Sequence, residues 1–149
     1  MKQTLQLFAI TFLAFGAPAL ANSSHYPILP YFPNGTSHAQ CNIQPAREQA
    51  ALAKQALGDG NKDQAYTLAG SAWLYLGRCH LGQGDDRTAG DAMFVIAVVE
   101  AERGQGHLAS IDSGIATAQY QFCYQNPTAS KDDVTYCRAM EEKIDSMSH

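Results

Sequence analysis

Three short glycine joints divide most of this 149-residue chain into segments of nearly equal length. They occupy residues 58–60, 82–84 and 104–106, and each has glycine at its first and third positions. The joints recur every 22–24 residues, an interval that holds one helix of about 18–20 residues, or about 27–30 Å. Connections this short place consecutive helices side by side and antiparallel. The spacing therefore predicts an all-α fold, an up-down array of about five antiparallel helices forming a bundle or a row of hairpins.

Apolar residues recur at helical spacing between these joints. Pro45 suits the first turn of a helix, and Asn61 with Gln64 and Ser130 with Asp133 form capping pairs at two further helix starts. The five expected helices cover residues 45–57, 61–81, 85–103, 107–125 and 130–147.

The segment 69–101 is the expected centre of the fold, a hairpin of the second and third helices. Its residues 92–99 are the most apolar run of the exported chain, and a helix that is apolar on all sides is the buried one. The fourth helix carries an apolar stripe that predicts a single buried face, made of Leu108, Ile111, Ile115, Ala118, Phe122 and Cys123.

Residues 1–21 are expected to be a signal peptide. Lys2 precedes a short apolar stretch, and Ala19-Leu20-Ala21 fits an A-x-A cleavage site. The stretch is shorter than the roughly 20 residues that span a bilayer, so an uncleaved anchor helix is the less favoured alternative. The mature protein should start at Asn22 and be exported, to a periplasm or to the outside. Asn22 and Asn34 each begin a glycosylation sequon, which matters only in a eukaryotic host.

The mature chain is expected to consist of an arm at 22–43 and one helical domain at 44–149. The arm alternates prolines with aromatic residues, among them Tyr26, Tyr31 and Phe32. Proline restricts the residue before it to extended conformations, so the arm should be extended. It either lies across the helices or supplies an aromatic contact for a partner.

Four cysteines lie in the exported part, which predicts two disulfides. In an up-down array, Cys41 precedes the first helix at the level where the second ends with Cys79. Cys123 ends the fourth helix near the start of the fifth, which holds Cys137. The predicted pairs are therefore Cys41–Cys79 and Cys123–Cys137.

The segment from Trp73 to Ala89 resembles the tetratricopeptide signature. Trp73, Leu76 and Gly77 match its W-x-x-L-G pattern, and Gly84-Asp85 with Ala89 match its later positions. This resemblance covers about a fifth of the chain and implies a tight α-hairpin and peptide binding. The sequence departs from the family at His80 and Met93, where aromatic residues are usual, and in its joint spacing, since that family repeats every 34 residues.

Composition excludes several classes of function. Without Lys2, nine Lys and Arg face fourteen Asp and Glu, and no basic stripe exists, so nucleic acid is not expected as a partner. No second apolar run is long enough to span a membrane. A zinc site could be drawn from His38, Cys41, Cys79 and His80, but oxidised cysteines do not bind zinc. No metal or cofactor and no catalytic residue is therefore expected.

The sequence thus predicts a non-enzymatic exported protein that binds a protein or peptide, as inhibitors, immunity proteins, adaptors and chaperones do. The expected contact residues are Tyr26, Tyr31 and Phe32, followed by the acidic pair Asp85 and Asp86, which are expected to be solvated at a helix start. One alternative is a carrier of a small apolar ligand held between helices. A second alternative is an enzyme whose site the sequence does not reveal.

Overall fold

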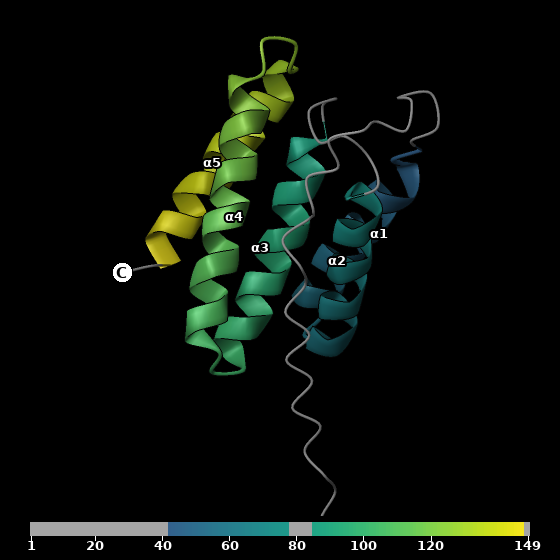
Figure 1. Cartoon of the computed structure of the whole chain (residues 1–149), viewed down its shortest axis with the longest axis vertical. Helices are drawn as coiled ribbons and strands as arrows, with labels where there is room; N and C mark the ends of the chain where they lie inside the picture. Colours follow the sequence, from purple (N-terminus) through teal and green to yellow (C-terminus); the bar gives the residue numbers. More distant parts are fainter. Residues whose placement is uncertain (1–41, 78–84, 148–149) are drawn as a thin grey trace, which may run out of the picture.

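A computed structural model describes residues 42–77 and 85–147, and within these ranges the chain forms five helices and no strand (Figure 1). Successive helices run in opposite directions (Figure 1). The prediction of five helices is confirmed. The helices are α1 (Gln44–Gly58), α2 (Lys62–Leu76), α3 (Asp86–Glu102), α4 (Gly106–Gln125) and α5 (Lys131–Met147).

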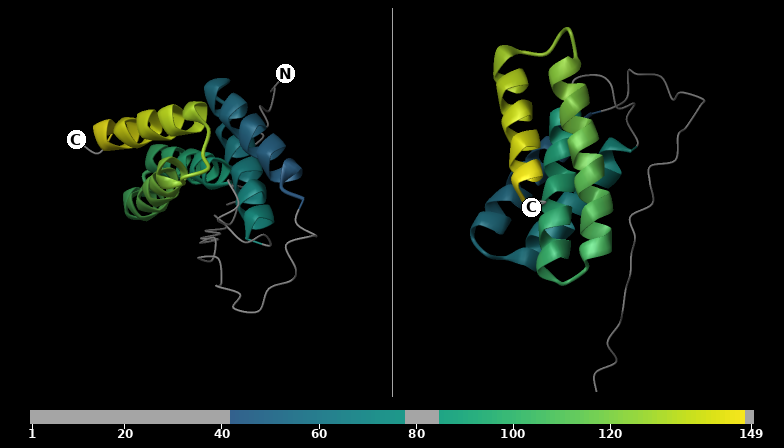
Figure 2. Two further views of the ribbon diagram at one scale, coloured as in Figure 1. Left: turned by 90° about the horizontal axis from the view of Figure 1, so that it is seen from above. Right: turned by 90° about the vertical axis from the view of Figure 1, so that its left-hand side faces the viewer.

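Helix α3 is the centre of the arrangement. Helices α2 and α4 flank it, α1 packs across α2 and α3, and α5 packs mainly on α4 (Figure 2). The backbones of α2 and α4 do not approach within 8 Å of each other. As a result, the α1–α2 pair and the α4–α5 pair meet chiefly through α3.

The burial of α3 confirms that the apolar run forms the core. Val95, Ile96 and Val99 are completely buried, and Met93 is 2% exposed. Burying a side chain of this size stabilises a fold by about 1.5–3 kcal/mol. None of the described helices is both long and apolar enough to cross a membrane.

Helices α1 and α2 pack through small side chains. Every buried residue of α1 is alanine, and α2 contributes three further buried alanines beside the larger Trp73 and Leu76. Alanine allows two helix backbones to approach closely and loses no side-chain entropy on burial. The alanines concerned are Ala46, Ala50, Ala53, Ala56, Ala65, Ala69 and Ala72.

The described helix boundaries follow from glycine and capping residues. Gly60 and Gly104 have φ of +77° and +74°, a conformation that glycine adopts without strain. The Asn61 side chain accepts a hydrogen bond from the Gln64 amide, and Ser130 Oγ accepts one from the Asp133 amide at 3.1 Å, which confirms Asn61 and Ser130 as N-caps. The Gln64 side chain bonds the Asn61 side chain and not its backbone N–H, so the capping box is incomplete.

Two predicted features of the helices are wrong, the second only in part. Helix α2 ends at Leu76 with Gly77 as its C-cap, not at Leu81, because glycine is a poor helix residue. The apolar stripe of α4 is only partly its buried face, since Cys123 is buried and Ile115 packs on the core, but Ile111 is 36% and Phe122 58% exposed. Helix α4 instead buries a face that includes polar side chains, namely Ala109, Asp112, Ala116, Gln119, Tyr120 and Cys123.

One disulfide lies within the described residues. Cys123 of α4 is bonded to Cys137 of α5, 14 residues later, as predicted. In the chain-entropy account, a loop of this length stabilises the fold by about 3 kcal/mol. The Cys41–Cys79 prediction falls outside the described residues, as does the joint at 82–84.

The close packing of α3 on α4 gives a direct test of the fold. A Cβ on Gly90 would come within 2.6 Å of the Tyr120 ring, whereas a Cβ on Gly114 would meet no atom within 4 Å. We expect Gly90→Ala to lower the free energy of unfolding by about 1–3 kcal/mol, because Tyr120 is fully buried and cannot move freely. The matched control Gly114→Ala should raise it by about 0.5–1 kcal/mol, because alanine is the better helix residue. Urea denaturation of both variants measures the difference, and equal effects would contradict this packing.

Candidate functional site

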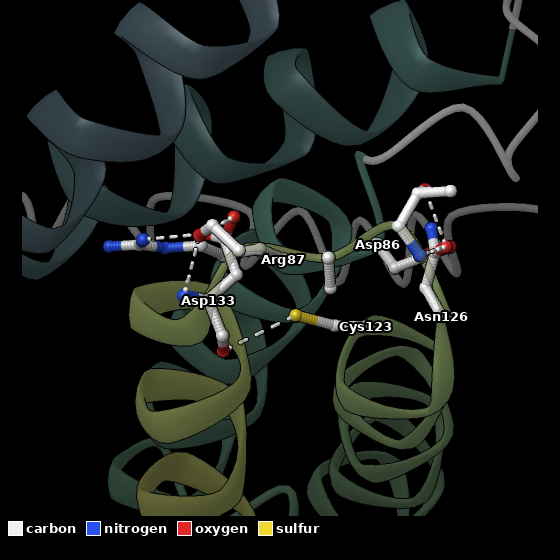
Figure 3. A pocket seen from close by; sticks show the side chains of 8 residues that line it. Asp86, Arg87, Cys123, Asn126 and Asp133 are labelled. Atoms are coloured by element: carbon white, nitrogen blue, oxygen red, sulfur yellow. Dashed lines mark hydrogen bonds and ion pairs between the residues drawn. The ribbon is translucent and has the colours of Figure 1, made fainter.

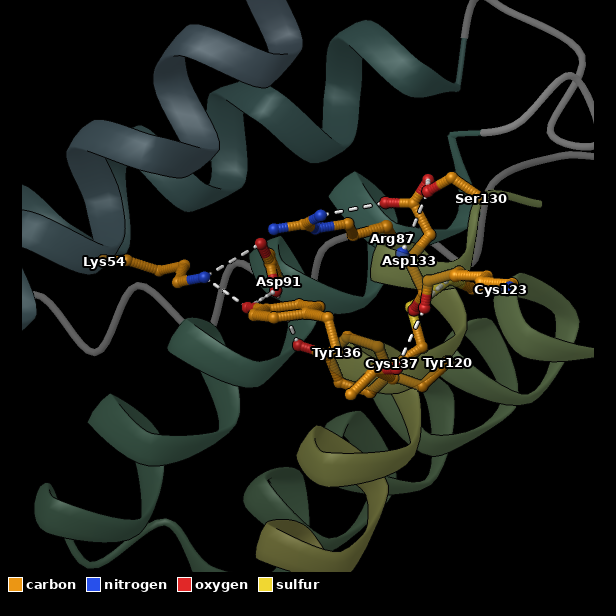
Figure 4. Close-up of a disulfide and its surroundings, with 11 residues drawn as sticks. Lys54, Arg87, Asp91, Tyr120, Cys123, Ser130, Asp133, Tyr136 and Cys137 are labelled. Carbon is orange, nitrogen blue, oxygen red and sulfur yellow. Dashed lines mark hydrogen bonds and ion pairs between the residues drawn. A yellow bond between two sulfur atoms is a disulfide. The ribbon is translucent and has the colours of Figure 1, made fainter.

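A buried carboxylate, Asp91 of α3, joins side chains from three other helices (Figure 4). Tyr120 of α4 and Tyr136 of α5 donate hydrogen bonds to its Oδ1 at 2.8 and 2.6 Å, respectively. Lys54 of α1 approaches Oδ2 at 3.1 Å and also donates to the Tyr136 hydroxyl. These four residues are called the Asp91 cluster below.

The carboxylate of the Asp91 cluster and one of its tyrosines are buried, while Lys54 reaches them from a partly exposed position. The Asp91 side chain is 11% exposed and Tyr120 is completely buried. Burial and the nearby negative charge of Asp91 raise the pKa of both Tyr120 and Tyr136 well above the usual value. Both hydroxyls therefore stay protonated and donate to the carboxylate, and neither is available as a phenolate nucleophile or base.

Arg87 extends this polar region along the α3–α5 interface. Its guanidinium lies 3.9 Å from the centre of the Tyr136 ring and 2.8 Å from Asp133 Oδ1. Hydrogen bonds from Arg87 and Ser130 lower the pKa of Asp133. Because each of these groups is occupied by another protein group, the arrangement suits holding helices together better than catalysis.

The Asp91 cluster should contribute strongly to stability. Asp91→Asn removes the charge that offsets Lys54 and weakens the hydrogen bonds from the two tyrosines. We expect a loss of about 2–4 kcal/mol in the free energy of unfolding. The control Asp145→Asn changes an exposed carboxyl on α5 and should stay within about 0.5 kcal/mol of the original protein. Chemical denaturation provides the measurement, and near-identical values for the two variants would show that the cluster contributes little.

A second buried polar group lies near the other ends of these helices. Glu100 of α3 is 3% exposed and Asp112 of α4 is 8% exposed, and Tyr66 of α2 donates a hydrogen bond to Glu100 Oε1 at 3.1 Å. Burial raises the pKa of Glu100 to about 7, with further contributions from a hydrogen bond and repulsion between Glu100 and Asp112. Near neutral pH, the two carboxyls can therefore share a proton.

This carboxyl pair predicts a pH dependence of stability. Glu100 has a higher pKa in the folded protein than in the unfolded chain, so folding takes up a proton between about pH 4.5 and pH 7. The free energy of unfolding should fall by about 2–3 kcal/mol across this interval, at about 1.4 kcal/mol per pKa unit.

Glu100→Gln should remove most of this decrease, which urea titrations at pH 5 and pH 8 measure. Glu142→Gln, an exposed position on α5, should leave the decrease unchanged. An unaltered pH dependence in Glu100→Gln would exclude Glu100 as its source.

A cavity of about 210 Å³ opens where α3 begins and the α4–α5 loop passes over it (Figure 3). We call it the α3 cavity. Two carboxylates, an arginine and several hydroxyl or amide groups line it together with apolar groups. Its lining consists of Asp86, Arg87, Cys123, Asn126, Thr128, Ala129, Ser130 and Asp133.

The acidic pair Asp85 and Asp86, predicted as a contact site, lies at this cavity and is buried, whereas a solvated pair is expected from the sequence. Asp85 and Asp86 are only 4% and 5% exposed, so the expectation that they are solvated is wrong. Asp85 is paired with Arg47 of α1 at 3.0 Å, and Asp86 lines the α3 cavity. Burial is the main cause that raises the pKa of both carboxyls.

The other predicted contact residues cannot be compared with this region, because they lie outside the described residues. Tyr26, Tyr31 and Phe32 fall outside the described residues, as do His38, Cys41, Cys79 and His80 of the rejected zinc site. The described part of the chain contains no group of three or more histidine, cysteine or acidic residues placed to hold a metal.

Sequence reasoning missed the Asp91 cluster and the Glu100–Asp112 pair. In the sequence, Asp91 is simply an acidic residue near a helix start, where acidic residues are favoured, and Tyr120 and Tyr136 are typical of a core or its edge. A usable signal existed in α4, where Asp112 is the single acidic residue of a helix without lysine or arginine. If such a residue is buried, its carboxyl needs a partner from another helix.

Comparison with known proteins adds no assignment. No protein-family model, curated protein or solved structure matches the chain.

Proposed function

We propose that this chain is an exported, non-enzymatic helical protein that binds a protein or peptide partner, and that α4 supplies the contact. The observation that carries this proposal is the exposed apolar surface of α4, which we call the α4 face. Phe122 and Ile111 on it are 58% and 36% exposed. It consists of Ile111, Ile115, Ala118 and Phe122.

Within the α4 face, Ile111 and Phe122 are exposed, whereas Ile115 is partly buried and packs against the hydrophobic core. The members of the face recur at intervals of three and four residues, which places them on one side of a helix. Ala116 and Tyr120, which are completely buried, lie on another side, and Gln121 reaches across to Glu141 of α5 at 2.6 Å. Helix α4 packs against α3 and α5 but not against α2, and Ile111 and Phe122 remain exposed beside these contacts.

The chemistry of the face indicates an apolar partner. Helix α4 contains no lysine or arginine, and its one acidic residue, Asp112, is buried. An uncharged apolar strip along a helix suits the apolar side of an amphipathic helix, whose anchoring residues recur at the same three- and four-residue spacing. We therefore propose an amphipathic helical segment as the occupant.

In this proposal, the contact residues predicted from the sequence rank second to the α4 face. Tyr26, Tyr31 and Phe32 form a second candidate surface, while the burial of Asp85 and Asp86 makes that pair less accessible to a large partner. Export from a cleaved signal peptide and a second disulfide, Cys41–Cys79, belong to the same proposal. The oxidised Cys123–Cys137 pair supports export, because disulfides persist mainly in oxidising compartments.

Peptide selection tests the α4 face directly. Helical peptides selected from a library on the original protein should lose at least about 30-fold in affinity for the double variant Ile111→Ser, Phe122→Ser, because apolar anchors commonly contribute about 2 kcal/mol or more. Fluorescence anisotropy measures the affinities.

A matched control is Leu52→Ser on α1, where the residue is 51% exposed. This variant should bind the same peptides normally. Peptides that bind all three proteins equally would refute the α4 face as the contact, provided that thermal melts show the double variant to be folded.

A further inference from the structure

One carboxylate near the start of α3 lacks the positive partner that its neighbours have. Three acidic side chains in this part of the molecule are paired, each with a different cation: Asp85 with Arg47 at 3.0 Å, Asp91 with Lys54 at 3.1 Å, and Asp133 with Arg87 at 2.8 Å. Within residues 42–77 and 85–147, no ion pair includes Asp86, although it is only 5% exposed.

The local backbone offsets only part of the charge of Asp86. Its own amide donates a hydrogen bond to its side chain, and the start of a helix acts as roughly half a positive charge. Asp85 shares the same helix start. Asp85 and Asp86 carry two negative charges, and Arg47 together with about half a positive charge from the helix start does not fully offset them. This end of α3 is therefore negative, and an uncompensated buried charge is costly.

Asp86 lines the α3 cavity together with both polar and apolar groups. Arg87 does not neutralise Asp86 there, because its side chain extends towards Asp133 and away from Asp86 (Figure 3). The Thr128 hydroxyl lies on the same wall and can accept a hydrogen bond. Ala129 and Cys123 supply apolar surface.

The volume of the α3 cavity limits the size of a ligand. About 210 Å³ is below the roughly 300–1,000 Å³ of pockets for drug-sized molecules. It holds about seven water-sized groups at about 30 Å³ each. A short alkyl chain that ends in a charged group fits this space.

We propose that the α3 cavity binds a primary alkylammonium group, with Asp86 as its counter-ion, the Thr128 hydroxyl as a second acceptor and Ala129 and Cys123 against the alkyl chain. The group belongs either to a small free amine or to a lysine side chain of a bound peptide. This site is separate from the α4 face and does not depend on the proposed function.

Titration of the mature protein with n-butylammonium chloride at pH 7, followed by NMR, tests the site. We expect saturable binding in the millimolar range, the scale set by one ion pair and a few methylene groups. The largest shifts should occur at residues lining the α3 cavity. Neutral n-butanol and anionic butyrate should bind at least about tenfold more weakly, since charge recognition requires the ammonium.

Two variants separate the site from general surface binding. Asp86→Asn should weaken n-butylammonium binding at least about tenfold, while Asp145→Asn should leave it unchanged. Ala129→Leu should abolish binding by filling the cavity with Asp86 intact, so the proposal can still be tested if Asp86→Asn does not fold. Blocked lysine, N-acetyl-lysine N-methylamide, should bind as n-butylammonium does if the natural source is a peptide, and more weakly if it is a free amine.

Three results would overturn the proposal. They are the absence of saturable binding, unchanged binding in a folded Asp86→Asn or Ala129→Leu variant, and butyrate binding as tightly as n-butylammonium.

Discussion

The buried carboxylate of Asp91 is the constraint on which the helix arrangement depends. A carboxylate that is 11% exposed is tolerated only if other groups replace the water that it loses. Here the replacements come from three different helices, through Lys54, Tyr120 and Tyr136. Each bond restricts distance and direction, so α1, α4 and α5 have to meet α3 at one level.

The apolar core alone does not fix the positions of the helices along their axes. Alanine and valine contacts along α1, α2 and α3 are non-directional, and neighbouring positions on such surfaces are similar in size. The Asp91 cluster selects one alignment of the helices, because only that alignment gives all its polar atoms a partner. Gly90 makes the same alignment possible, because a larger residue beside Asp91 would occupy the space of the Tyr120 ring. We infer that the cluster contributes specificity as well as stability.

The helices could be predicted from the sequence because their signals are local. Gly60, Gly104, Asn61 and Ser130 act on adjacent residues, and the run at 92–99 is apolar enough to require burial on every side. The sites could not be predicted in the same way, because Asp91 meets Lys54 37 residues earlier and Tyr136 45 residues later. The prediction that the apolar stripe forms the buried face of α4 failed for a related reason. Hydrophobicity indicates which face can be buried, but partners from other helices let α4 bury Asp112 and Tyr120 instead.

The contacts that hold α5 in place bear on the proposal that the protein is exported. Helix α5 packs mainly on α4 and meets α3 less closely, so its position depends strongly on Tyr136, on the Arg87–Asp133 pair and on the Cys123–Cys137 bond. Tyr136 is adjacent in sequence to Cys137, and Tyr120 lies one helical turn before Cys123. The covalent bond therefore holds both tyrosines close to Asp91. A disulfide in this position stabilises the cluster only where cysteines stay oxidised, and this dependence favours an exported protein over one that works in a reducing cytosol.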